Sequence, residues 1–192
     1  MEAEENEKLL DRQHELLFHV GRSIRYHDRR RAFFEILHRI SSVFVVLLAS
    51  SVFLDLLGSA NERPWWLTLI ALVAAMFAAF DIIVGFARSA TLHHDLKRRF
   101  IQLEIEISTQ DVTQQSLRAH QAEGLRIEQD EPPVYRALDL LCHNELAHAK
   151  GYTDEAHFFT VDPWPRFTRH FLHWANLTQN GKPRTPAKAN GA

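Results

Sequence analysis

The chain has 192 residues, of which 46% are hydrophobic and 24% are charged, and its formal net charge is -2. Its mean hydropathy of -0.23 is typical of a water-soluble protein, because polar flanks average out two concentrated apolar runs. The single cysteine, Cys142, excludes an intrachain disulfide and any metal or iron-sulfur site built from several cysteines. Glutamates crowd the extreme N-terminus and arginines the stretch 22–39, which suits a membrane flank better than a nucleic-acid surface. We therefore expect no nucleic-acid partner.

The first thirty-nine residues are predicted to form a cytoplasmic amphipathic helix. Leu10, Leu17, Val20 and Ile24 recur at helical spacing and give this segment an apolar stripe. Gly21 interrupts the stripe with a residue of low helix propensity. We expect this helix to run from about Glu7 to Arg39 toward the membrane, within a domain of residues 1–39.

Two apolar runs follow, and each predicts a membrane-spanning helix. Residues 40–57 contain Asp55 as their one charge, and residues 65–87 contain only Asp81. Each run meets the ~20 residues that a helix needs to cross a bilayer. The alternative is a buried helical pair inside a soluble four-helix bundle. The fold class we predict is an all-α membrane protein, with a two-helix transmembrane hairpin over residues 40–87.

The flanks of these runs predict their orientation. Trp65 and Trp66 suit the aromatic belt of a membrane interface, and Pro64 suits a first helical turn. Lys and Arg precede the first run and follow the second, whereas the connecting loop has only Arg63. The residues counted are Arg22, Arg25, Arg29, Arg30, Arg31, Arg39, Arg88, Lys97, Arg98 and Arg99. The positive-inside rule then predicts that both termini lie in the cytoplasm.

Helices are also expected after the second run. A stripe formed by Leu92, Leu96, Phe100, Leu103 and Ile107 predicts that the second helix continues as a cytoplasmic stalk, within a segment 88–130. This stripe should pack on the stripe near the N-terminus, within one subunit or between subunits. The spacing of Ser108 and Asp111 is that of a capping box and predicts a new helix or a kink there, ending near Gln129.

A C-terminal helical module is predicted over residues 131–178, after the break at Pro132 and Pro133. Its first helix, residues 134–150, should place one face inward and end before Gly151. The inward residues are Leu138, Cys142, Leu146 and Ala149. Residues 179–192 have the composition of a flexible tail.

The last predicted helix of this module is amphipathic in an unusual way. One face carries the aromatic residues Trp164, Phe167, Phe171 and Trp174, and the other carries Arg166, Arg169, His170 and His173. This pattern is typical of a helix that lies in a membrane surface, with rings at headgroup level and cations near anionic lipid. The alternative is that the aromatic side chains pack on the cytoplasmic helices.

An acidic residue within a spanning helix costs about 2.5 to 3.5 kcal/mol and therefore marks a candidate functional site. Asp81 shares a helix face with the small residues Ala74, Ala78 and Gly85, so this face should meet another helix, with His38 or Arg39 as partner. Asp81 either holds the helices together by hydrogen bonding or lines a water-filled path in an oligomer. Asp55 is the weaker candidate, because it lies near the outer end of its helix.

Catalytic and metal-binding motifs are not found in the sequence. His143 and His148 are five residues apart, which does not bring them onto one helix face, and His157 completes no recognised ligand spacing. Phosphate-binding loops, dinucleotide fingerprints and nucleophile elbows are also missing. We expect a protein that is not an enzyme and that needs no metal or cofactor.

The order of parts resembles the bacterial SLATT family, the two-transmembrane effector domains associated with nucleotide-signalling systems. The resemblance covers about residues 21–107: the basic and aromatic approach YHDRRRAFFEILHR, the hairpin, and the helix ARSATLHHDLKRRFIQLEIEI. It implies an oligomeric protein of the bacterial inner membrane that forms a pore or disturbs the membrane in antiphage or other conflict systems. The chain departs from that layout in its long C-terminal part. The alternative function is a membrane-anchored adaptor whose cytoplasmic helices dock partner proteins.

Overall fold

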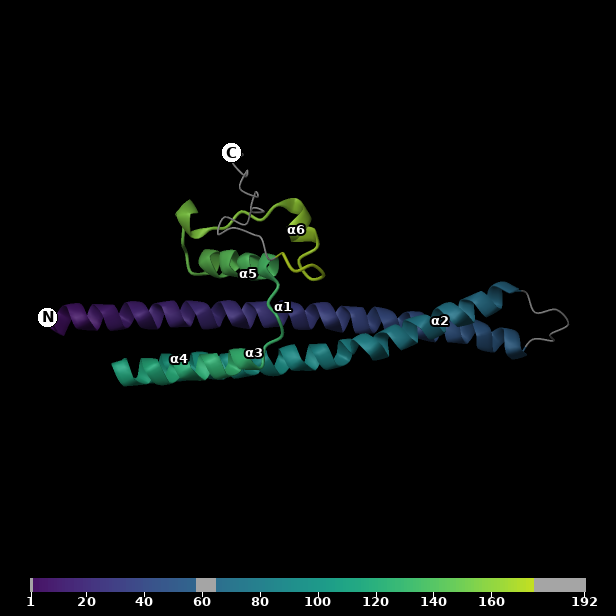
Figure 1. Cartoon of the computed structure of the whole chain (residues 1–192), viewed down its shortest axis with the longest axis horizontal. Coiled ribbons are helices and arrows are strands. Elements are labelled where there is room, and N and C mark those ends of the chain that lie inside the picture. The colour runs from purple at the N-terminus through teal and green to yellow at the C-terminus, as the bar shows by residue number, and fades with distance from the viewer. Residues whose placement is uncertain (1, 58–64, 175–192) are drawn as a thin grey trace, which may run out of the picture. The chain divides into compact units, whose positions relative to one another are not determined.

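The computed structural model describes residues 2–57 and 65–174, and every regular element in those ranges is a helix. In chain order these are α1 Glu2–Leu57, α2 Trp65–Val84, α3 Phe86–Thr109, α4 Gln114–Gln129, α5 Arg136–Ala149, the 3-10 turn Glu155–His157 and α6 Pro163–Phe167 (Figure 1). The all-helical fold class is thereby confirmed. Pro64 and the tail 179–192 lie outside the described residues.

The chain divides into two compact units. The bundle unit comprises Met1–Arg29 and His94–Ala192, and the apolar unit comprises Arg30–His93. α1 contributes to both units as one uninterrupted helix of 56 residues. The stretches on the two sides of the apolar unit therefore fold together as a single module.

The bundle unit is built around the two apolar stripes. Val20 of α1, Phe100 and Leu103 of α3, and Ile127 of α4 belong to one cluster of fully buried side chains. The two stripes thus pack together within one chain. Leu10 and Leu92, at the outer ends of the stripes, remain exposed.

α5 docks on α1 through a second cluster, in which Tyr26 packs with Leu138 and Cys142. The hydroxyl of Tyr26 accepts a hydrogen bond from the backbone N–H of Tyr135 at 3.0 Å. Gly21 also lies at this contact: a Cβ atom there would lie 3.4 Å from a methyl carbon of Leu146, an ordinary packing distance. The predicted inward face of α5 is correct for three of its four residues, whereas Ala149 is exposed.

The turn between α3 and α4 corrects one prediction. Ser108 does not cap a helix; its hydroxyl donates to the carbonyl of Glu104 at 2.7 Å, and α3 continues to Thr109. The capping box lies five residues later, where the hydroxyl of Thr113 accepts from the N–H of Ser116 and the hydroxyl of Ser116 accepts from the N–H of Thr113, both at 3.0 Å. The predicted end of α4 near Gln129 is confirmed.

Two glycines end helices in left-handed conformations, which glycine adopts without steric cost. Gly151 (φ 81°) follows α5 and donates to the carbonyl of His148 at 3.0 Å, as predicted. Gly85 (φ 64°) separates α2 from α3, so the helix that was expected to continue into the stalk is interrupted there. The amide of Gly85 still donates to the carbonyl of Asp81 at 2.8 Å, which keeps the break local.

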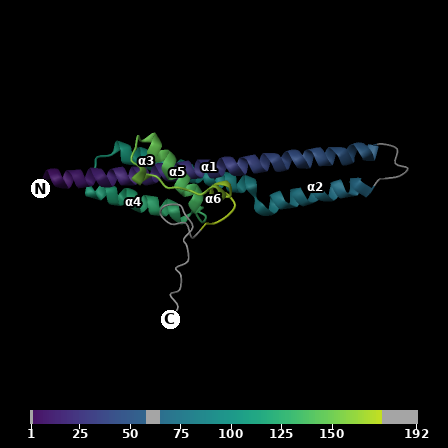
Figure 2. The ribbon, with the colours of Figure 1, turned by 90° about the horizontal axis from the view of Figure 1, so that it is seen from above.

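The apolar unit contains the last part of α1, α2 and the start of α3. In both views α2 runs beside the last part of α1 (Figures 1 and 2). The rings of Phe44 and Phe77 stack between the two helices with centroids 5.6 Å apart. The structure thus holds two helices that are long and apolar enough to cross a membrane.

The apolar side chains of this unit are exposed to a degree that water does not favour. The most apolar windows of the two helices are only 6% and 11% buried. Ile82 and Ile83 are each 81% exposed. A core helix of a soluble bundle buries most of such a window, whereas lipid tails solvate it without cost. This exposure disfavours the buried helical pair of a soluble protein.

Candidate functional site

The candidate site in the apolar unit is the contact between His38 of α1 and Asp81 of α2. Nδ1 of His38 lies 3.3 Å from Oδ2 of Asp81, and the two side chains are 44% and 22% exposed. The sequence analysis predicted His38 or Arg39 as the partner of Asp81, and in the structure His38 makes the contact. Asp81 lies one turn before Gly85, so its own carbonyl also receives the amide that bridges the helix break.

The second oxygen of Asp81, Oδ1, is buried and has no hydrogen-bond partner within the described residues. A carboxylate accepts up to four hydrogen bonds, and an acceptor left unpaired in an apolar setting is costly. A water molecule or a group from another chain would stabilise Asp81 at this position.

The small-residue face predicted around Asp81 is the covered side of α2. Ala74, Ala78, Asp81 and Gly85 are all half-buried, whereas Ile82 beside them is exposed. Asp81 faces α1, where Ser41 is 6% exposed. Small side chains on both helices let the two backbones approach closely, as in membrane helix pairs. The expected helix contact is thus made within the same chain.

A second cluster in the apolar unit was not foreseen from the sequence. The guanidinium of Arg30 lies 4.5 Å from the ring centroid of Phe34 and 5.7 Å from that of Phe33. Phe34 in turn stacks on His93 at 5.7 Å with an interplanar angle of 12°. The spacing of Arg30 and Phe34, four residues apart on one helix, was the signal available. Arg30 is 5% exposed and therefore belongs to the packing of this unit, not only to a charged flank.

Several basic residues that predicted the orientation also form ion pairs inside the bundle unit. Arg22 lies 3.2 Å from Asp139, Lys97 lies 2.7 Å from Asp28, and Arg29 pairs with Glu145. These pairs hold α1 to α5 and to α3. The positive-inside rule counts Lys and Arg irrespective of nearby acids, so the pairs leave the orientation argument unchanged.

The predicted aromatic helix near the C-terminus is wrong in its length. α6 covers only Pro163–Phe167, because the chain turns at Thr168, whose hydroxyl caps the carbonyl of Trp164 at 2.9 Å. Trp174 folds back, donates to that same hydroxyl at 3.0 Å, and packs on Ala137 and Leu140 of α5. The alternative, in which the aromatic side chains pack on other helices of the chain, therefore holds for Trp174.

The other membrane-interface candidates are exposed. Trp164, Phe167 and Phe171 are 62%, 78% and 63% exposed, and Arg166 lies exposed beside them. Arg169 is half-buried, and the imidazoles of His170 and His173 belong to the same short segment. Trp65 and Trp66, at the start of α2, are also exposed. The helix of Asp55 is described, but its side chain lies outside the described residues.

The histidines considered as metal ligands make other contacts. Nε2 of His143 donates to the backbone carbonyl of His157 at 3.1 Å, and the ring of His148 packs on Phe158 with centroids 4.2 Å apart. Within residues 2–57 and 65–174, no three ligand-type side chains gather in a group that could hold a metal ion.

Comparison with known proteins gives no relative. No family model, no curated protein and no solved structure matches the chain.

Proposed function

We propose that this protein is a multi-pass protein of the bacterial inner membrane whose two apolar helices cross the bilayer as a hairpin. The exposure of large apolar side chains along both helices supports a lipid environment, since it would be unfavourable in water. The excess of Lys and Arg on the outer flanks supports cytoplasmic positions for both termini. The bundle unit then forms one cytoplasmic module, built from the chain segments before and after the hairpin.

Within this frame, the protein is an oligomeric effector that perturbs or permeabilises the membrane. The observation that carries this proposal is Asp81, an acid within the apolar run of α2, in contact with His38, which lies two residues before the apolar run of α1. Ionisable groups within a spanning helix are rare and tend to line water-filled or proton-conducting paths. The layout that resembles SLATT effectors favours the same role, including action in an antiphage or other conflict system.

Assembly of several copies would complete the site. Oδ1 of Asp81 has no hydrogen-bond partner in the described part of the chain, and the small-residue face around it is only half covered. Because α1 of the same chain covers this face and Oδ1 is buried, the missing donor would come from water that enters beside Asp81 when several copies assemble. The large exposed side chains on the opposite face remain in contact with lipid.

The experiment that tests the effector is a leak assay in bacteria that express the full chain from a titratable promoter. Membrane potential and dye entry are measured for the native chain, for Asp81→Asn and for Ala78→Leu, at matched membrane abundance. Asp95→Asn is the control, because Asp95 is an exposed acid of α3 outside the apolar run. The proposal expects a leak that both site variants reduce and the control retains.

Two outcomes of this assay would contradict the effector proposal. A leak of the same size in Asp81→Asn and the native chain would remove the site from the mechanism. Intact membranes at high abundance of the native chain would favour the alternative function.

That alternative is a membrane-anchored adaptor, and the bundle unit gives it a specific basis. Val20 of α1 is fully buried in the same cluster as Phe100 of α3, so both flanks of the apolar unit contribute to one folded module. Such a module can present a docking surface for cytoplasmic proteins. Crosslinking of the full chain in cells should then yield a specific partner while the membrane stays intact. Fragments that start at Arg88 lack α1 and are unsuitable for this test.

A further inference from the structure

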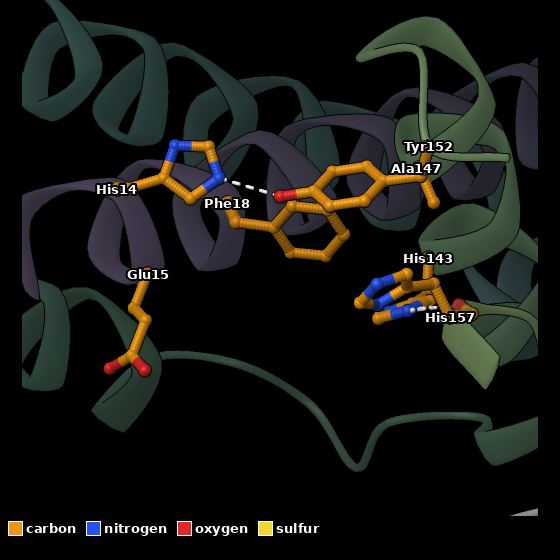
Figure 3. Close-up of a pocket in the computed structure, with 7 residues that line it drawn as sticks. All are labelled: His14, Glu15, Phe18, His143, Ala147, Tyr152 and His157. Carbon is orange, nitrogen blue, oxygen red and sulfur yellow. Dashed lines mark hydrogen bonds between the residues drawn. The ribbon is translucent and has the colours of Figure 1, made fainter. Parts of the chain in front are cut away.

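A cavity of about 350 Å³ lies in the bundle unit (Figure 3). Its walls come from α1, from α5 and from the segment that follows α5. The lining residues are His14, Glu15, Phe18, His143, Ala147, Tyr152 and His157. The volume falls at the lower end of the range for sites that bind small molecules.

Aromatic rings form most of the wall and are held in place by one another. Phe18 packs against His143 with centroids 4.9 Å apart, and Tyr152 packs against His157 at 4.8 Å. Phe18 and Tyr152 meet edge to face at 6.1 Å. The hydroxyl of Tyr152 is further fixed by Nε2 of His14 at 2.7 Å (Figure 3). The ring cluster is therefore positioned before any ligand enters.

The fixed charge among the residues that line the cavity is negative. Glu15 contributes the one carboxylate, and the lining contains neither Lys nor Arg. Burial, and to a smaller degree the nearby charge of Arg22, lowers the pKa of His143, so this imidazole is neutral at physiological pH. A cavity with a carboxylate and no fixed cation repels phosphates and other anions.

The hydrogen-bonding groups of the cavity wall also favour a ligand that donates hydrogen bonds. Nε2 of His143 is committed to donating to the carbonyl of His157. In the neutral ring the other nitrogen, Nδ1, then carries a lone pair and accepts. The carboxylate of Glu15 lies across the cavity from the imidazoles of His143 and His157 (Figure 3) and likewise accepts. Ring faces attract cations through their negative π surface.

We propose that this cavity binds a small organic cation, an amine carried on an apolar body, with the amine toward Glu15 and the body against Phe18 and Ala147. This site is independent of the proposed membrane activity and does not involve Asp81. A ligand there would bridge α1 to α5 and to the segment after α5, which lie far from α1 in the sequence. It would thereby stabilise the docking of α5 on α1.

The test uses the full chain in detergent micelles and calorimetric titration, with empty micelles subtracted. The probes are benzyltrimethylammonium, protonated benzylamine and phenylacetate, which share a phenyl body and differ in charge. Both cations should bind with Kd near or below about 1 mM, as expected at ~0.5 kcal/mol per non-hydrogen atom, a value between those of very small and drug-sized ligands. Phenylacetate should bind at least about tenfold more weakly because of the carboxylate.

Two variants test the contribution of Glu15, and the two cations distinguish hydrogen bonding from contact with the ring faces. Glu15→Gln should weaken cation binding about fivefold, as expected for loss of one close charge partly screened by water. Glu7→Gln, an exposed acid of the same helix outside the cavity, should leave it unchanged. Tighter binding of benzylamine would assign the main contribution to the acceptors, and tighter binding of the quaternary cation to the ring faces.

Three outcomes would overturn the proposal. These are binding of phenylacetate as tight as that of the cations, no cation binding below about 10 mM, and equal effects of Glu15→Gln and Glu7→Gln. Because none of these readouts involves membrane leakage, failure here leaves the effector proposal standing, and failure of the leak assay leaves this site standing.

Discussion

Nδ1 of His38 lies 3.3 Å from Oδ2 of Asp81, and this contact joins two positions 43 residues apart in the chain. The pair lies between two helices that also pack through the stacked rings of Phe44 and Phe77. The contact fixes the lengthwise alignment of α1 and α2, because a shift of either helix by one turn would separate the two groups.

The first prediction is that His38 and Asp81 are energetically coupled. In a double-mutant cycle with His38→Leu and Asp81→Leu, the coupling free energy should be about 0.6 kcal/mol and at most about 1.7 kcal/mol, the range of hydrogen bonds between membrane helices. The free energy of unfolding in mixed micelles provides the measurement. Arg39→Leu is the control, since Arg39 is exposed and should show no coupling to Asp81. Equal coupling of both residues would argue against the observed pairing.

A second prediction concerns the buried pair of His27 and Glu131. Nε2 of His27 lies 3.0 Å from a carboxylate oxygen of Glu131, with side-chain exposures of 1% and 11%. Glu131→Ala deprives a buried ring nitrogen of this acceptor and should lower the free energy of unfolding by about 1 to 3 kcal/mol. Thermal unfolding of the bundle unit in the full chain, followed by circular dichroism, provides the measurement.

The matched control for Glu131 is Glu123. It pairs with Arg126 at 3.0 Å on the exposed side of α4, where both side chains are solvated. Glu123→Ala should change the unfolding free energy by less than about 0.5 kcal/mol. Equal losses in the two variants would mean that burial does not distinguish the pairs.

A third prediction follows from the buried thiol of Cys142. Burial raises its pKa from 9.0 to about 12, with the nearby charge of Arg29 opposing the shift. At pH 8 the thiolate fraction should be about a thousandfold lower than in the unfolded chain. Alkylation of Cys142 by iodoacetamide should therefore be slow in the native protein and fast in denaturant. Fast alkylation of the native chain would contradict its placement in the α1–α5 interface.

The same shift predicts a dependence of stability on pH. Above pH 9 the unfolded chain releases the thiol proton while the folded chain keeps it, so the unfolded state binds fewer protons and stability falls between pH 9 and about 12. One proton gives a slope of at most about 1.4 kcal/mol per pH unit. Cys142→Ala should flatten this alkaline slope, and an unchanged slope would assign it to other groups.

A fourth prediction concerns the exposed aromatic residues of α6 and the turn after it. Trp164, exposed with Arg166 beside it, is expected to contact the lipid headgroup region, whereas Trp174 packs on α5. In proteoliposomes with brominated lipid, a variant with Trp164 as its single tryptophan should be quenched more strongly than one with Trp174. Equal quenching would place both tryptophans away from the bilayer.

The helical class and the bundle core could be predicted from the sequence, because apolar periodicity determines which face of a helix is buried. Val20, Phe100 and Ile107 show this, since each lies in the predicted stripe and is fully buried. The sequence could not choose between packing within and between subunits, because the periodicity is the same in both cases.

The points missed depend on single hydrogen bonds or backbone conformations. Gly85 has a small-residue spacing that suits helix packing, and its left-handed φ is invisible in that pattern. Ser108 has a capping spacing, yet its hydroxyl bonds within its own helix. The spacing of Trp174 suits a helical aromatic face, but in the structure its indole donates to the hydroxyl of Thr168 and packs on α5. In each case a local hydrogen bond or backbone conformation, which residue spacing does not reveal, determines the structure.

The most direct test of the account is the membrane topology of the full chain. In a Cys142→Ala background, single cysteines are placed by Glu5→Cys, Asn61→Cys and Asp154→Cys, and spheroplasts are treated with a membrane-impermeant maleimide. The account predicts labelling of Asn61→Cys in intact spheroplasts and of Glu5→Cys and Asp154→Cys only after permeabilisation. Labelling of either flanking position in intact spheroplasts, or recovery of the chain in the soluble fraction, would contradict the two-span arrangement.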